Sequence, residues 1–147
     1  MTEKEMRDTN CAILRTTRLH HRLCEKNLKE LGLHRSQHRL LVLLDREGTL
    51  PSQKELAGRL EVSPAAVAVS LKKLESDGYI ARNAAEKDSR FNHVLITEKG
   101  RRVLEESRAG FYQLDKAMYR GISKEEAEKL SMLMKRLAEN LENALEG

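Results

Sequence analysis

The sequence has no tryptophan, and aromatic residues make up only 3% of its 147 residues, whereas charged residues make up 34%. This composition favours a helical protein with an aliphatic core and a charged surface. No apolar run reaches membrane-spanning length, and none of the signal-peptide type follows the first ten residues. We therefore expect a cytoplasmic protein that makes no contact with a membrane.

Cysteine is scarce as well. Cys11 and Cys24 are the only two cysteines, and they lie thirteen residues apart in one predicted helix. That separation places their Cα atoms roughly 20 Å apart, whereas disulfide-bonded residues have Cα atoms within about 7 Å. A structural disulfide within one straight helix is therefore excluded.

Motifs typical of enzymes are also lacking. The chain has no glycine-rich phosphate loop, no nucleophile motif and no convergent set of histidine, aspartate and glutamate residues. We therefore expect a protein that is not an enzyme and needs no cofactor.

Positive charge is concentrated in the middle of the chain. The net charge is +4, with 13 basic and 9 acidic residues in the segment 34–102 but 7 basic and 9 acidic residues in 103–147. A basic central segment is what a nucleic-acid partner would prefer.

Proline and glycine are missing from residues 3–31, and apolar residues recur there at steps of three and four. This pattern predicts one long amphipathic helix that ends at Gly32. A second helix is predicted for residues 35–46.

Two short helices follow. Ser52 and Glu55 form a capping box that opens the first of them, and residues 61–62 are the turn. Ser63 caps the next helix, which has Pro64 at its first position and ends at Gly78. On a helical wheel, one side of this helix carries Val67, Ser70, Leu71 and Leu74, and the other carries Ala65, Val69, Lys72, Lys73 and Ser76.

The runs 79–83 and 93–97 are rich in β-prone residues and are separated by a polar, charged tip, which predicts a β-hairpin. A long helix to about residue 120 comes next. Ser123 with Glu126 forms a capping box for a last, leucine-spaced helix.

This order predicts a mainly α protein with a small β-hairpin wing. It is a winged helix-turn-helix flanked by long terminal helices that are too sparse in apolar residues to pack alone. The predicted domains are an N-terminal dimerisation helix (1–33), a DNA-binding lobe (34–102) and C-terminal dimerisation helices (103–147).

Three stretches resemble the multiple-antibiotic-resistance regulator (MarR) family of winged-helix transcription factors. They are LGLHRSQHRLLVLL, SQKELAGRLEVSPAAVAVSLKKLESDGYIAR and DSRFNHVLITEKG, within residues 31–102. The most specific piece is Asp88-x-Arg90 followed by LITEKG. The resemblance implies a homodimer that binds a pseudo-palindromic operator in double-stranded DNA, usually as a repressor that a small molecule, a metal or an oxidant releases.

The resemblance also implies which residues contact DNA. Methyl groups on the fourth helix suit the thymine 5-methyl group, and its lysines suit phosphate or guanine. Arg90 resembles the arginine that enters the minor groove. The competing interpretations are a helix that is merely alanine-rich and a solvated charged hairpin. The predicted DNA-binding residues are Pro64, Ala65, Ala66, Val69, Lys72, Lys73, Arg82, Lys87, Asp88 and Arg90.

In the family, a pocket for a small apolar effector commonly lies between the first two helices, the fifth helix and the winged lobe. The predicted lining residues are His20, Cys24, His38 and Leu41. The alternatives are zinc binding by pairs four residues apart (His20 with Cys24, His34 with His38), oxidation of Cys11 or Cys24, and an ordinary core histidine. No metal site is predicted.

Together these observations predict a sequence-specific DNA-binding transcriptional regulator, a homodimeric repressor released by a small apolar or phenolic effector. The alternatives are a metal- or oxidant-responsive regulator of the same fold and a winged helix used only as a protein-interaction module.

Overall fold

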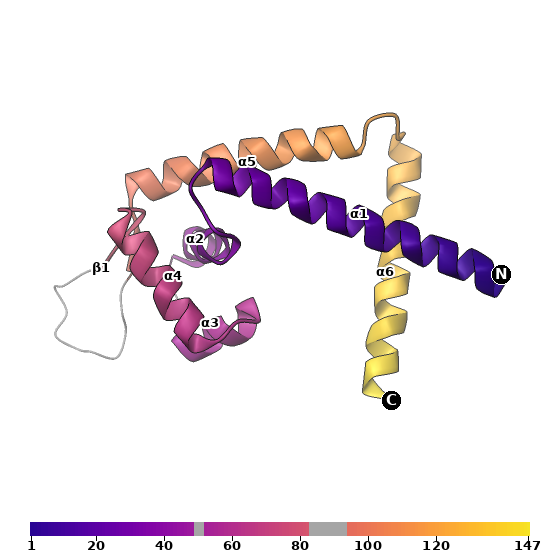
Figure 1. Ribbon diagram of the computed structural model, residues 1–147, viewed down its shortest axis with the longest axis horizontal. Coiled ribbons are helices and arrows are strands. Elements are labelled where there is room, and N and C mark those ends of the chain that lie inside the picture. The colour runs from indigo at the N-terminus through magenta and orange to yellow at the C-terminus, as the bar shows by residue number, and fades with distance from the viewer. Residues whose placement is uncertain (49–51, 83–93) are drawn as a thin grey trace. The chain divides into compact units, whose positions relative to one another are not determined.

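The computed structural model describes residues 1–48, 52–82 and 94–147 and is mostly helical (Figure 1). The chain forms two compact units, residues 1–111 and 112–147. None of the described helices combines the length and the apolar character that a membrane span requires. The elements are α1 (Glu3–Glu30), α2 (Arg35–Glu47), α3 (Gln53–Leu60), α4 (Pro64–Ser76), β1 (Ile80–Arg82), β2 (Val94–Ile96), α5 (Glu98–Met118) and α6 (Lys124–Glu146).

Local capping explains where α1 begins and ends. The Thr2 hydroxyl accepts a hydrogen bond from the Glu5 N–H (3.3 Å), while the Thr2 N–H donates to the Glu5 carboxylate (2.7 Å). These two bonds form a capping box. Gly32 then takes a left-handed backbone conformation with φ 69°, which suits glycine because it has no Cβ. The long first helix predicted from the sequence is confirmed.

The helix-turn-helix of α3 and α4 is also fixed by local signals. Ser52 and Glu55 form the predicted capping box at the start of α3, and Ser63 accepts a hydrogen bond from the Ala66 N–H (3.1 Å) at the start of α4. Glu61, in the turn, has a left-handed backbone with φ 55°. The predicted starts of both helices are confirmed.

α2 holds the end of α3 in place. The Arg39 guanidinium donates hydrogen bonds to the carbonyl oxygens of Leu60 (2.8 Å) and Arg59 (3.0 Å). The last carbonyl groups of a helix have no partner within the helix. Arg39 therefore satisfies two of them and ties α3 to α2.

The core of residues 1–111 is aliphatic, as the composition predicts. One hydrophobic cluster combines side chains from α1, the segment after it, all four later helices of this unit and both strands. Its buried members are Leu28, Leu33, Leu40, Leu41, Leu44, Leu56, Ala57, Leu60, Val67, Leu71, Leu74, Ile80, Val94, Val103 and Leu104.

The two strands form the base of the predicted hairpin. They are antiparallel, with Ile80 opposite Ile96 and Arg82 opposite Val94. Among the described residues, β1 begins one residue after the start of the predicted run 79–83, and β2 ends one residue before the end of the predicted run 93–97. The predicted tip lies outside the described residues.

α5 begins in close contact with the chain that enters β1. The Thr97 N–H donates to the Tyr79 carbonyl oxygen (3.0 Å), and the Thr97 hydroxyl accepts from the Gly100 N–H (3.1 Å). A Cβ added to Gly100 would overlap the Tyr79 carbonyl oxygen and lie 2.8 Å from Ile96 Cγ1. Glycine at position 100 therefore allows α5 to start against β1.

Further along, α5 packs closely against α1, and Figure 1 shows the two helices side by side. Asn27 Nδ2 donates to the Ser107 carbonyl oxygen (3.5 Å). A Cβ added to Gly110 would lie 2.6 Å from that same nitrogen. A residue with a Cβ at position 110 would therefore require the Asn27 side chain to move.

α6 opens with the predicted capping box of Ser123 and Glu126. In the single chain none of its residues is buried. Its exposed apolar side chains recur at helical spacing and are Leu130, Met132, Leu133, Met134, Leu137, Leu141 and Leu145.

Candidate nucleic-acid interface

The outward side of α4 carries small apolar residues and two lysines. Ala65, Lys72 and Lys73 are exposed, and the Val69 side chain is 70% exposed. Together with Ala65, Val69 gives the outward side a small apolar surface beside the two lysines. Pro64 is also exposed, whereas Ala66 is half-buried.

Burial of the inward side of α4 in the core determines which residues of the helix face outward. Val67, Leu71 and Leu74 are buried in the core. Ser70 is buried as well, and its hydroxyl lies 3.0 Å from the Ser36 hydroxyl near the start of α2. The sorting of residues predicted from the helical wheel is confirmed.

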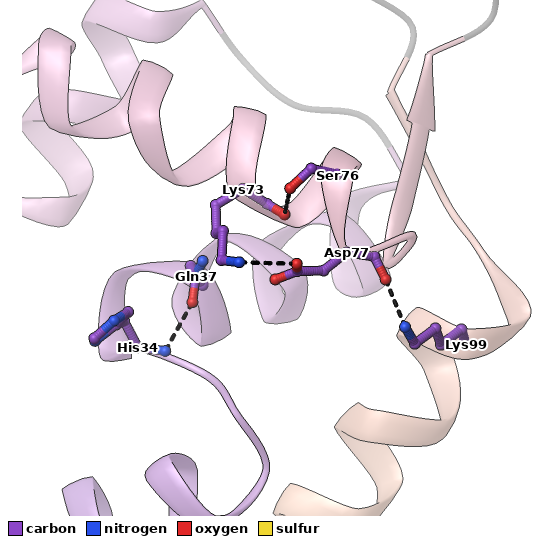
Figure 2. Close-up of polar contacts among 6 residues, drawn as sticks. All are labelled: His34, Gln37, Lys73, Ser76, Asp77 and Lys99. Carbon is purple, nitrogen blue, oxygen red and sulfur yellow. Dashed lines mark hydrogen bonds and ion pairs between the residues drawn. The ribbon is translucent and has the colours of Figure 1, made fainter.

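The end of α4 is held by polar contacts (Figure 2). The Lys73 ammonium lies 3.0 Å from an Asp77 carboxylate oxygen. The Asp77 carbonyl oxygen accepts a hydrogen bond from the Lys99 ammonium (2.6 Å), and the Thr97 hydroxyl donates to the Gly78 carbonyl oxygen (2.6 Å). The orientation of α4 is therefore fixed by the first residues of α5.

The role of Asp77 was missed by the sequence prediction. Lys73 and Asp77 are four residues apart, and side chains at this spacing are neighbours on a helix. That spacing was the available signal for the ion pair. The bond from Lys99 joins residues 22 positions apart and depends on how α5 packs.

The wing residues can be placed only in part. Arg82 is the last residue of β1. The predicted contacts of Lys87, Asp88 and Arg90 lie outside the described residues.

Residues 31–90 match the sequence model of the MarR family. The helix-turn-helix-type transcriptional regulator YdgJ of Bacillus subtilis, which is uncharacterised, is 32% identical over 112 residues, which cover 76% of this chain and 68% of YdgJ. This chain belongs to the MarR family. It is a transcriptional regulator with a winged helix-turn-helix.

Solved structures show the MarR fold as well. YusO of B. subtilis aligns with a TM-score of 0.79 at 24% identity, over 95% of this chain and 98% of YusO. A mutant of S. aureus MepR bound to an oligodeoxyribonucleotide aligns with a TM-score of 0.67 at 19% identity, over 90% of this chain and 97% of MepR.

His38 is one of the residues that the sequence predicts to line an effector pocket. The ring is half-buried and packs edge-on against Phe111, with ring centroids 5.2 Å apart. The Ser107 hydroxyl donates to the Leu104 carbonyl oxygen (2.8 Å), so it accepts the hydrogen bond from His38 Nε2 (2.9 Å). The arrangement therefore includes the single hydrogen bond expected of a core histidine.

Burial, together with the positive charge of Arg108, lowers the pKa of His38 below its usual 6.5. Arg108 itself is paired with Asp45 (2.7 Å). The native state disfavours the charged imidazole. Just below pH 6.5 the unfolded chain therefore binds more protons than the native chain does. The stability due to neutral His38 is therefore complete above about pH 6.5 and is lost as the pH falls toward the lowered pKa.

We accordingly expect His38→Gln to flatten the fall in the free energy of unfolding between pH 7 and pH 5. Urea denaturation at several pH values measures this slope. His34→Gln, at an exposed position, is the control for loss of an imidazole. An identical slope in the parent and in His38→Gln would contradict the assignment.

The other predicted pocket residues differ in exposure. Leu41 is completely buried in the core, so it has no free surface for a ligand. His20 is exposed and Cys24 is half-buried, and the Cys24 sulfur lies 3.7 Å from each ring nitrogen of His20. Cys11 is exposed on the same helix.

Metal ligands gather nowhere in the part of the chain that the structure describes. There, no three His, Cys, Asp or Glu side chains are placed so that they could hold one ion. The pairs His20 with Cys24 and His34 with His38 therefore gain no third ligand from the described residues.

Proposed function

We propose that the protein is a homodimeric repressor that binds a pseudo-palindromic operator, with α4 of each protomer in the major groove. The observation that carries the proposal is the exposed side of α4, where Val69 and two lysines project from a buried scaffold in a chain of the MarR family. The MepR structure bound to an oligodeoxyribonucleotide supports a DNA ligand for this fold. Such a role implies a cytoplasmic protein.

Each part of the α4 surface has its own task in this proposal. The methyl groups of Ala65 and Val69 contact thymine methyl groups, while Lys72 binds phosphate. No carboxylate of residues 1–48, 52–82 or 94–147 lies within ion-pair distance of the Lys72 ammonium. Lys72 is therefore the lysine of α4 that is readily available to phosphate.

The wing supplies the second contact. Arg90 enters the minor groove, where narrow A·T-rich DNA concentrates negative potential and attracts arginine. Asp88 fixes Arg90, and Lys87 and Arg82 lie near the phosphates.

The dimer is built from the terminal segments 1–33 and 103–147, which flank the DNA-binding lobe 34–102. The unburied apolar side of α6 supports this division. On α1, Leu14, Leu19 and Leu23 are likewise exposed.

A small apolar or phenolic effector releases the repressor in this proposal. His38 is the residue of the predicted pocket that combines partial exposure with contacts to α5. His20 and Cys24 belong to the same proposed site. Metal- or oxidant-dependent release remains the alternative, with Cys11 and Cys24 as the thiols to test.

The test is a set of titrations of parent, Lys72→Ala and Arg90→Ala against A·T-rich and G·C-rich duplexes at two salt concentrations. Lys72→Ala should weaken binding to both duplexes alike and flatten the salt dependence by about one unit per lost phosphate contact. Arg90→Ala should cost roughly 1–3 kcal/mol per half-site on A·T-rich DNA and less on G·C-rich DNA.

The outcomes separate the competing functions. If Arg90→Ala loses the same affinity on both duplexes, the wing contacts only phosphate. If it loses no affinity, Arg90 is not part of the interface. A parent protein that fails to bind any duplex at low salt would favour a protein-interaction module.

A further inference from the structure

We propose that Asp77 limits the DNA affinity of α4 by holding the Lys73 ammonium in an ion pair beside the phosphate backbone. The inference rests on the proposed DNA-binding function and adds a residue that sets its strength. The pair is drawn in Figure 2.

Asp77 is the fixed member of the pair. Its N–H donates to the Lys73 carbonyl oxygen (2.9 Å), and its own carbonyl oxygen accepts from Lys99 (2.6 Å). The Lys99 ammonium also lies 4.9 Å from the centre of the Tyr79 ring. The Asp77 side chain is 26% exposed, whereas that of Lys73 is 59% exposed. The backbone of Asp77 is therefore anchored, and the more exposed Lys73 side chain reaches toward its carboxylate.

The pair lies on one flank of α4, between its outward side and α2. At about 100° per residue, Lys73 is displaced from the outward group of Ala65, Val69 and Lys72 toward Ser70. Ser70 contacts Ser36 of α2 (3.0 Å). By the same rotation Asp77 lies about 40° beyond Lys73 toward Ser70. A helix in the major groove has phosphates along its flanks, so in the proposed complex the Lys73 ammonium lies between the DNA backbone and the Asp77 carboxylate.

The ion pair contributes little to folding stability. Both groups are partly in water, where the attraction is weak and screened by salt. The lysine also precedes the acid in the chain, which is the less favourable order for residues four apart on a helix. The main effect of the ion pair is therefore on DNA affinity. A paired lysine releases fewer counterions from phosphate, and the carboxylate repels phosphate.

The test compares Asp77→Asn with the parent on one generic duplex and on a scrambled duplex of the same length, across a salt series. Asparagine keeps the shape of the side chain and the backbone contacts. We expect Asp77→Asn to bind both duplexes about threefold to tenfold more tightly at low salt. The slope of log Kobs against log salt should steepen by about 0.9 per protomer, as one more phosphate contact predicts.

Two controls isolate the mechanism. Asp45→Asn removes a carboxylate of similar exposure (28%) that pairs with Arg108 instead, and it should leave affinity within about twofold of the parent, because it lies outside α4. In the Lys73→Ala background, Asp77→Asn should increase DNA affinity much less than it does in the parent, since no ammonium remains to be released. An undiminished gain in that background would overturn the proposal.

The results also separate this inference from the function on which it rests. If the parent binds no duplex at low salt, the proposed function fails. If the parent binds and a folded Asp77→Asn binds no more tightly, only the role of Asp77 fails. Should Asp77→Asn not fold by circular dichroism, Asp77→Ser and Lys73→Gln decide the matter. Asp77→Ser should tighten binding in the parent. Added to Lys73→Gln, Asp77→Ser should raise affinity less than it does in the parent, because only the repulsion of phosphate is then removed.

Discussion

Without residues 123–147 the chain is expected to sediment as a monomer or to aggregate, and to lose roughly a hundredfold or more in affinity for DNA. The first expectation follows from α6, whose leucines are exposed in the single chain and are covered by a second copy in the proposed dimer. The second follows because a monomer occupies one half-site, and binding then approaches the non-specific range. Sedimentation velocity and a DNA titration measure the two effects.

A single substitution tests the same surface while keeping α6. Leu137→Glu places a charge on the apolar side of α6, whereas Lys135→Gln changes the net charge by the same amount on the opposite side. We expect dissociation of the dimer in Leu137→Glu and no change in Lys135→Gln. A stable dimer in the truncated chain would refute the assignment of the dimer to these helices.

Gly100→Ala is expected to lower the free energy of unfolding by about 3 kcal/mol, near the upper end of the usual cost of overpacking. The added Cβ would overlap the backbone carbonyl oxygen of Tyr79, and backbone cannot turn aside as a flexible side chain can. α5 must therefore move away from β1, which disturbs the bonds that hold the end of α4. Urea denaturation gives the stability, and a DNA titration should show weaker binding.

Gly58→Ala is the matched control. Gly58 lies within α3, and a Cβ added there would meet no atom within 4 Å. Alanine favours a helix more than glycine does, so stability should stay constant or rise by up to about 1 kcal/mol. An equal loss of stability in both variants would show that the Tyr79 contact is not the cause.

The sequence predicts the helix boundaries well, because they depend on neighbouring residues. Ser52, Ser63 and Ser123 each cap the helix that the sequence assigns to them. The strands are less predictable, since their ends depend on pairing between segments. Tyr79 and Thr97 belong to the β-prone runs but lie outside β1 and β2.

The candidate site likewise has one part that the sequence predicts and another that it does not. The outward side of α4 could be predicted, since helical geometry alone sorts Val67 from Val69. The bond between His38 and Ser107, 69 positions apart, and that between Asp77 and Lys99 could not, because they depend on tertiary packing. The ion pair with Asp77 distinguishes Lys73 from the adjacent Lys72, and its four-residue spacing is a signal that the sequence does offer.

The close contact between Gly110 and Asn27 has an evolutionary consequence. The two positions are 83 residues apart in the chain, yet a Cβ at one occupies the space of the amide group at the other. In homologues that keep this helix packing, a residue with a Cβ at position 110 requires the side chain at position 27 to be smaller or to turn away. The two positions should therefore covary across descendants of this sequence.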